Sequence, residues 1–290
     1  MARDYMTFEW DAAEYEALAG PMTRWGADFL KFLVERRAIG GDEDVIDAGC
    51  GTGRVTELLL QYVPDGTVLA VDASEAMVEA TAGRFARDPR VRIERRDLLR
   101  LEVEKPVDLV FSTATLHWIK DHEHLFKRFA RTLKPGGRLV AQCGGEGNIS
   151  RLRTAMGQVM REDRFEGFFV RWKDPWNFAD PATTRARLEA AGFEEIETWL
   201  HEEAAEFLSI EELIGYLKTA VLGQHLTFLP EAEHEPFAAA VAMQLAAGGP
   251  LVIEYVRLNI LATKVLATKV PDTFGDEVDV LRVNKAEERA

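Results

Sequence analysis

Short runs of apolar residues alternate with longer segments in which apolar side chains recur about once per helical turn. The first helical period runs from Glu14 to Ile39 and ends at Gly40-Gly41. Beyond it, predicted buried strands cover 44–48, 67–72, 91–95, 108–112 and 138–143, and predicted helices cover 53–62, 74–85 and 122–133. Strands that alternate with helices predict an α/β fold, with a parallel sheet covered by helices on both faces.

The rhythm changes after Gly144. The remaining pattern predicts helices over 151–164, 182–190, 210–222 and 231–247, strands over 193–200 and 252–263, and an aromatic loop over 168–178. The two later helices fit a helical cap inserted at about 203–249. A tandem Leu-Ala-Thr-Lys-Val repeat over 261–270 is too short a period for a solenoid. We expect one domain over 1–264 and a C-terminal extension over 265–290.

Composition and charge narrow the class of partner. The chain has 290 residues, 47% of them apolar, and 49 acidic against 35 basic residues give a net charge of −14. Such a charge opposes binding to nucleic acid or an anionic membrane, so we expect a small-molecule substrate. Two cysteines make no disulfide framework. With neither a signal-peptide pattern nor an apolar run of about 20 residues, the expected location is cytoplasmic; the oligomeric state stays open.

A glycine-rich turn, Asp47-Ala48-Gly49-Cys50-Gly51-Thr52-Gly53, follows the first predicted strand. Glycine lets the backbone turn sharply and lets a ligand approach closely. Arg54 stands where the dinucleotide pattern G-x-G-x-x-G needs its last glycine, and no phosphate-binding G-K-S/T follows. The turn alone could therefore hold several kinds of nucleoside.

Acidic residues end the neighbouring strands and narrow the choice of ligand. Asp72 ends the second strand beside the turn, where a carboxylate can accept from both hydroxyls of a ribose, although it could instead only cap the next helix. Asp97 follows the third strand and suits an adenine amino group. Three acidic strand ends without a phosphate-binding lysine favour a cationic, phosphate-free nucleoside, and S-adenosylmethionine fits that description.

With Asp72, Asp97-Leu98 and Leu133-Lys134-Pro135-Gly136-Gly137, the turn resembles the motifs of class I S-adenosylmethionine-dependent methyltransferases. The resemblance covers roughly residues 10–264 and implies a Rossmann-like, doubly wound, seven-stranded sheet whose last strand is antiparallel. It implies that Ser112 lies beside the sulfonium. The cofactor-binding residues that it implies are Asp47, Gly49, Cys50, Gly51, Asp72, Ala73, Met77, Asp97, Leu98 and Ser112.

The segment Thr115-Leu116-His117-Trp118-Ile119 resembles the group that methylates small carboxylic acids, the trans-aconitate methyltransferases among them. An early Trp10-Asp11-Ala12-Ala13-Glu14-Tyr15 adds to the likeness. The resemblance makes His117 and Trp118 the candidate catalytic residues, which would orient the substrate oxygen. The expected substrate-binding residues are Trp10, Tyr15, His117, Trp118 and Trp176.

Several functions stay open at this point. A carboxylate is ionised at neutral pH and needs no general base, whereas a phenol or amine needs one, for which His117 is the candidate. An aminopropyl transferase and a non-catalytic S-adenosylmethionine-binding module are further alternatives. His117, His122 and His124 cluster without a usual zinc spacing, so no metal is expected.

Overall fold

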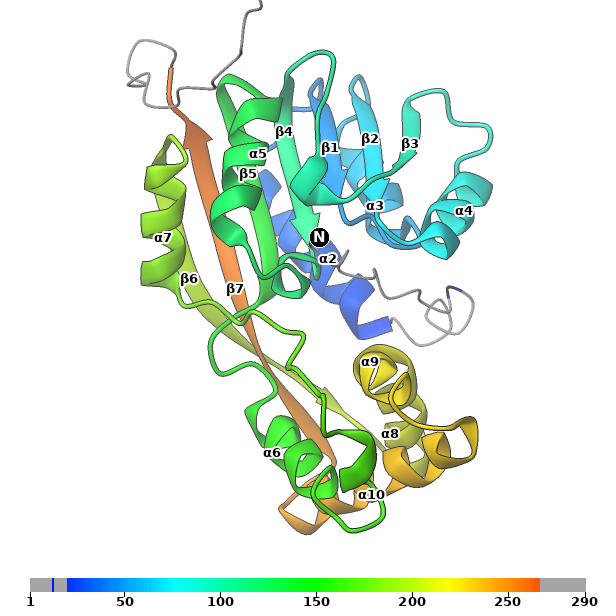
Figure 1. Cartoon of the computed structure of the whole chain (residues 1–290). Helices are drawn as coiled ribbons and strands as arrows, with labels where there is room; N and C mark the ends of the chain where they lie inside the picture. The colour runs from blue at the N-terminus through cyan, green and yellow to red at the C-terminus, as the bar shows by residue number, and fades with distance from the viewer. Residues whose placement is uncertain (1–11, 13–19, 267–290) are drawn as a thin grey trace, which may run out of the picture.

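The central sheet of the computed structural model has the strand order β3-β2-β1-β4-β5-β7-β6 (Figure 1). Residue 12 and residues 20–266 are described. The strands are β1 Asp44–Ala48, β2 Thr67–Asp72, β3 Val91–Arg95, β4 Val107–Thr113, β5 Leu133–Gly144, β6 Phe193–Glu206 and β7 Val252–Lys264. β1 to β5 pair in parallel, and β7 runs antiparallel between β5 and β6. The predicted α/β sheet with an antiparallel last strand is confirmed.

The helices are α2 Gly20–Glu35, α3 Arg54–Tyr62, α4 Glu75–Arg84, α5 His122–Thr132, α6 Ser150–Val159, α7 Pro181–Ala190, α8 Ile210–Tyr216, α9 Gly223–Leu226 and α10 His234–Ala247. Short 3₁₀ turns lie at η1 Leu98–Arg100, η2 Leu116–Trp118, η3 Glu166–Phe168 and η5 Glu231–Glu233, and η4 Leu217–Val221 is a π-helical turn. The helix expected over 210–222 is thus two pieces, and the helix expected over 151–164 ends at Val159.

Alternate residues of the parallel strands enter two different cores, one on each face of the sheet. Val45 of β1 packs with Phe29 and Leu33 of α2 and with α3. Its neighbour Ile46 belongs to the core on the opposite face, together with Phe126 of α5 and Leu188 of α7. This alternation is the period of two that a strand imposes, and burial on both faces explains the continuous apolar stretches inside β2, β4 and β5.

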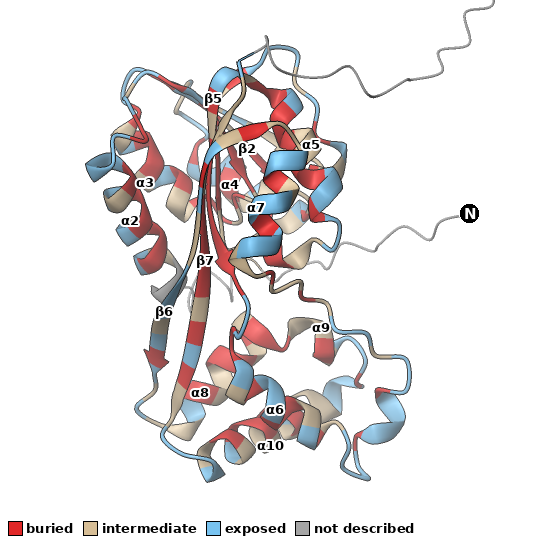
Figure 2. Cartoon of the chain, turned by 90° about the vertical axis from the view of Figure 1, so that its left-hand side faces the viewer, coloured by how far each residue is buried: buried red, intermediate tan, exposed pale blue. Residues whose placement is uncertain are grey.

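β6 and β7 run on beyond the other strands as a two-stranded ribbon that carries a helical lobe (Figures 1 and 2). Helices α6, α8 and α10 of the lobe enclose a third core, which includes Met156, Leu213 and Phe237. Ile253 of β7 joins that core. The range 203–249 expected for the cap includes α8 to α10. Helix α6, which precedes this range in the sequence, also packs against α10. Of the expected extension 265–290, only residues 265 and 266 lie within the described part of the chain.

Glu43 links the segment that follows α2 to strand β5. Its carboxylate is 5% exposed and accepts the backbone N–H groups of Gly40 and Gly41 and a guanidinium N–H of Arg138 on β5, the last at 2.7 Å. Arg138 also donates to the carbonyl of Arg37, at 3.2 Å. The buried carboxylate of Glu43 thus accepts hydrogen bonds from the backbone of the turn that leads into β1.

Replacing this acid should destabilise the protein. Glu43→Ala leaves two backbone N–H groups and a guanidinium without their acceptor, so we expect a loss of about 3 kcal/mol in the free energy of unfolding. Urea denaturation measures it. The matched change Glu57→Ala, in an exposed ion pair with Arg84, should cost less than about 1 kcal/mol. Equal losses would remove the anchoring role of Glu43.

Candidate functional site

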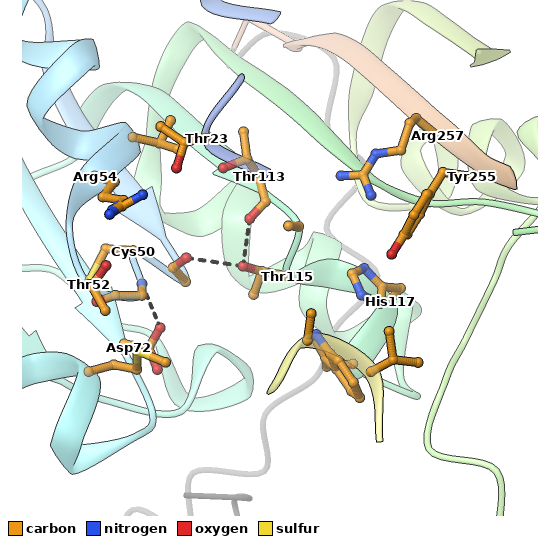
Figure 3. A pocket seen from close by; sticks show the side chains of 18 of the residues that line it. Thr23, Cys50, Thr52, Arg54, Asp72, Thr113, Thr115, His117, Tyr255 and Arg257 are labelled. Atoms are coloured by element: carbon orange, nitrogen blue, oxygen red, sulfur yellow. Dashed lines mark hydrogen bonds between the residues drawn. The ribbon is translucent and has the colours of Figure 1, made fainter. Parts of the chain in front are cut away.

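A pocket opens at the carboxyl ends of β1, β2 and β4, the edge where open α/β sheets bind ligands. The glycine turn forms one side of it (Figure 3). The segment after β4 and β7 form the other side, and Ala220 and Val221 of the helical lobe also line it. The pocket therefore lies between the sheet and the lobe.

The backbone of the glycine turn is left-handed at three positions. The φ angles are 82° at Gly49, 56° at Gly51 and 80° at Gly53, a region that favours glycine. The N–H groups of Gly49 and Cys50 both donate to the carbonyl of Val71, at 2.8 and 3.0 Å. The turn is therefore held against the end of β2.

The three glycines differ in what surrounds them. A Cβ on Gly49 would lie 2.1 Å from the hydroxyl oxygen of Thr115, and one on Gly53 would lie 2.8 Å from the ring of Phe85. A Cβ on Gly51 would meet no protein atom within 4 Å. Gly49 and Gly53 are thus required by the protein's own packing, whereas Gly51 borders the open space of the pocket.

Asp72 lies beside this turn at the end of β2. Its Oδ2 accepts the N–H of Gly51 and its Oδ1 accepts the N–H of Ser74, both at 3.0 Å. The hydroxyl of Ser74, and not Asp72, caps α4 by accepting the N–H of Met77 at 3.3 Å. Asp72 therefore lines the pocket and fixes the turn at the same time.

Asp47 adds a second carboxylate at the same end of the pocket. It is 2% exposed and accepts the hydroxyl of Thr56 at 2.6 Å. Burial raises the pKa of Asp47 to about 7; the Thr56 hydrogen bond opposes this shift and the negative charge of Asp72 adds to it. Two carboxylates so placed favour a positively charged ligand, because a cation relieves the cost of ionising both.

The predicted cofactor residues fall into two groups. Those in the pocket lining are Asp47, Gly49, Cys50, Gly51, Asp72 and Met77. Ser112 is fully buried and its hydroxyl donates to the carbonyl of Ala48 at 2.7 Å, Asp97 caps η1 by accepting the N–H of Leu99 at 2.9 Å, and Leu98 is 5% exposed in the core. These three residues and Ala73 do not line the pocket, and their contact with the cofactor stays a prediction.

His117 lies in η2, directly after β4, and is 8% exposed. Its Nδ1 accepts the N–H of Gly144 at 3.2 Å, so the hydrogen-bond network assigns the ring proton to Nε2. Burial lowers the pKa of His117, with smaller contributions from the positive charge of Arg257 and from the neighbouring His122, and together they bring it to about 3. The imidazole is therefore neutral and can donate from Nε2.

An aromatic wall surrounds His117. The ring of Trp118 lies 5.1 Å from the His117 ring and 5.9 Å from Trp176, and Trp176 stacks on Phe178 at 5.6 Å. The structure thus brings together three of the five residues predicted to bind the substrate. Trp10 and Tyr15 lie outside the described residues.

Sequence reasoning did not assign Tyr255 and Arg257, which line the pocket from β7. They are 4% and 3% exposed, and the Arg257 guanidinium lies 5.3 Å from the centre of the Trp25 ring. Thr23 and Arg54 line the pocket near the glycine turn (Figure 3). The available signal was Arg257 between the apolar residues Val256 and Leu258 of β7.

Within residue 12 and residues 20–266, no three His, Cys, Asp or Glu side chains gather closely enough to hold a metal ion. No helix in this part of the chain is both long and apolar enough to cross a membrane.

Comparison with known proteins identifies a matching family and several relatives. Residues 45–137 match a family model described as a methyltransferase domain. The trans-aconitate 2-methyltransferase of Methylobacterium nodulans is 33% identical over 192 residues, which is 66% of this chain and 67% of that protein. The protein of the same name from Sinorhizobium medicae is 27% identical over 263 residues, covering 88% and 98% of the two chains.

Solved structures share the fold. The YcgJ protein of Bacillus subtilis superposes with a TM-score of 0.57 at 16% identity, covering 82% of this chain and 98% of that one. Phosphoethanolamine N-methyltransferase 2 of Haemonchus contortus, solved with S-adenosylhomocysteine, gives 0.55 at 19% identity and covers 88% and 57%. With the glycine turn, its acidic neighbours and the relatives above, the chain belongs to the class I S-adenosylmethionine-dependent methyltransferases, in the trans-aconitate methyltransferase group.

Proposed function

We propose that this methyltransferase methylates a carboxylate oxygen of a small carboxylic acid and uses no general base. The state of His117 carries the proposal. Its Nδ1 already accepts the Gly144 N–H, and its pKa is lowered to about 3, so the ring is a poor proton acceptor in the neutral range. A carboxylate needs no acceptor, because it has lost its proton well below neutral pH. The names of the relatives, trans-aconitate 2-methyltransferase, support the same acceptor class.

The donor side would be built by the glycine turn and the acids beside it. S-adenosylmethionine supplies a methyl group that its sulfonium has already activated. Asp72 lines the pocket beside the glycine turn, and the two oxygens of a carboxylate suit the two hydroxyls of a ribose. Asp47 and Asp72 favour the positive charge of the sulfonium, and Gly51 leaves room for the ligand. Asp97 and Leu98 remain our candidates for the adenine end.

Transfer then requires orientation more than acid–base chemistry. A carboxylate oxygen forms the new C–O bond as the C–S bond breaks, its electron pair passes to sulfur, and no proton moves. The Nε2–H of His117 would hold the acceptor group in line by one hydrogen bond, with Trp118 and Trp176 as the apolar wall. Correct placement of two bound reactants can supply a large part of a rate enhancement.

Methyl transfer from radiolabelled cofactor to separate pools of acids, phenols and amines tests this proposal. We expect label in the acid pool, in a product that mild alkali hydrolyses because it is an ester. Label confined to the phenol or amine pool would overturn the choice of acceptor. A protein that binds the cofactor and labels no pool would be a binding module.

Removing His117 should slow the reaction without adding a dependence on pH. His117→Asn loses one orienting hydrogen bond, so we expect turnover to fall about ten- to a hundredfold. A group with a pKa of about 3 is neutral throughout the range from pH 6 to 9, so the variant should keep the shape of the wild-type profile, in which an inflection near pH 7 belongs to Asp47. A pH–rate profile measures this. Recovery of the variant at alkaline pH would indicate a lost base and contradict the proposal.

The matched control is His124→Asn. His124 is exposed and contacts the carbonyl of Leu99 outside the pocket lining, so its replacement should leave both rate and profile unchanged.

Two glycine variants should separate cofactor binding from folding. Gly51→Ala should cost about 1–2 kcal/mol of stability, because alanine is strained in a left-handed conformation. Its methyl group lies in the open space of the pocket, so cofactor affinity should fall at least about tenfold. Gly49→Ala drives its Cβ into Thr115, so its main effect should be a loss of about 3 kcal/mol or more in stability. Calorimetric titration and thermal unfolding measure the two effects. Unchanged affinity in Gly51→Ala would place the cofactor elsewhere.

A further inference from the structure

The pocket carries opposite charges at its two ends. Asp47 and Asp72 lie at the glycine turn. Arg257, on β7, lies across the pocket from Asp72 (Figure 3). Arg257 and His117 line the same side of the pocket, and the positive charge of Arg257 adds to the lowering of the His117 pKa that burial causes. It also opposes the rise that burial causes in the pKa of Cys143. An anion entering this side meets a positive potential in surroundings that screen it poorly.

Arg257 is held in place by its neighbours. In the β5–β7 ladder it pairs with Gly144, the residue whose N–H binds His117. The Trp25 ring lies against its guanidinium, and Tyr255, two residues earlier, contacts the hydroxyl of Tyr216 at 2.6 Å. Gly144 itself has no room for a side chain, because a Cβ would lie 2.7 Å from Asn148 and Phe178. His117 and Arg257 are thus two fixed groups on either side of one glycine.

The two groups suit different parts of an acceptor. A guanidinium binds a carboxylate through two parallel charge-assisted hydrogen bonds, which hold it firmly but draw electron density from both oxygens. A neutral imidazole N–H makes one weaker bond and leaves the second oxygen available as the nucleophile. The reacting carboxylate therefore belongs at His117, and a carboxylate that only anchors the molecule belongs at Arg257.

We propose that Arg257 is a specificity residue that binds an anionic group of the acceptor other than the one that is methylated. This inference rests on the proposed function. It means that the enzyme selects acids with at least two carboxylates over those with one. It also means that one methyl group is added per acceptor, because a second turnover would place the neutral ester against the buried guanidinium.

Matched acceptors test the proposal on the intact protein. Succinic, glutaric and adipic acids are each compared with their own half-amide, which keeps the length and one carboxylate but has no charge at the other end. We expect kcat/KM of wild type to be about 30-fold or more higher for the best diacid than for its half-amide. In Arg257→Gln this ratio should fall close to one, through slower reaction of the diacid alone. Arg257→Lys should keep part of the ratio.

Two further measurements separate specificity from structure. Calorimetric affinity for S-adenosylmethionine should be unchanged in Arg257→Gln, since the residue lies away from the glycine turn. Arg131→Gln, at the exposed end of α5, is the matched control and should keep the wild-type ratio.

The outcomes are distinct. Equal rates of wild type on a diacid and its half-amide would overturn the anchoring role and leave carboxylate methylation standing. Absence of transfer to all of these acids and to the acid pool would overturn the proposed function itself. If Arg257→Gln does not fold, the wild-type ratio and the Arg257→Lys ratio still decide. A diacid product with two ester groups would also count against the anchor.

Discussion

The site depends on one constraint, the left-handed turn that leads from β1 into α3. The turn can hold its shape because its polar groups are used by three neighbouring elements. Val71 of β2 accepts two of its N–H groups, and the Thr81 hydroxyl of α4 donates to the carbonyl of Gly51 at 2.7 Å. Thr115, after β4, donates to the carbonyl of Gly49 at 3.1 Å. Since Thr115 lies two residues before His117, one hydrogen bond links the position of the donor side to that of the acceptor side.

Much of the fold could be predicted because its signals are local. Short apolar stretches in β2, β4 and β5 alternate with helical periods, and the glycine turn and Asp72 identify the edge that binds the ligand. The lobe was harder to predict. The strand expected to end at Leu200 continues to Glu206. The prediction stopped short because the residues beyond Leu200 are largely exposed and polar. A half-exposed ribbon contains no apolar run from which it could be predicted.

The site could be predicted only where position along the chain determines position in space. Asp72 ends β2, and Gly51 and His117 lie within four residues of the ends of β1 and β4, so all three reach the pocket. Arg257 reaches it because β7 inserts beside β5, a pairing that no local pattern encodes. Ser112 and Asp97 also follow the expected spacing, but the Ser112 hydroxyl donates to the carbonyl of Ala48 and the Asp97 carboxylate accepts the N–H of Leu99, so their contact with the cofactor stays a prediction. The protonated nitrogen of His117 depends on Gly144, 27 residues away, and could not be read from sequence.

The two walls of the pocket come from different stretches of the chain. The donor wall lies within residues 45–137, the part that matches the methyltransferase family model, together with Thr23. Apart from Thr115, His117 and Trp118, the facing wall comes from residues 148–257, from Asn148 to Arg257. Substitutions on β7 or in the lobe can therefore change the facing wall without altering the residues that form the donor wall. A match over residues 45–137 therefore covers the donor wall and leaves most of the facing wall, from Asn148 to Arg257, outside it.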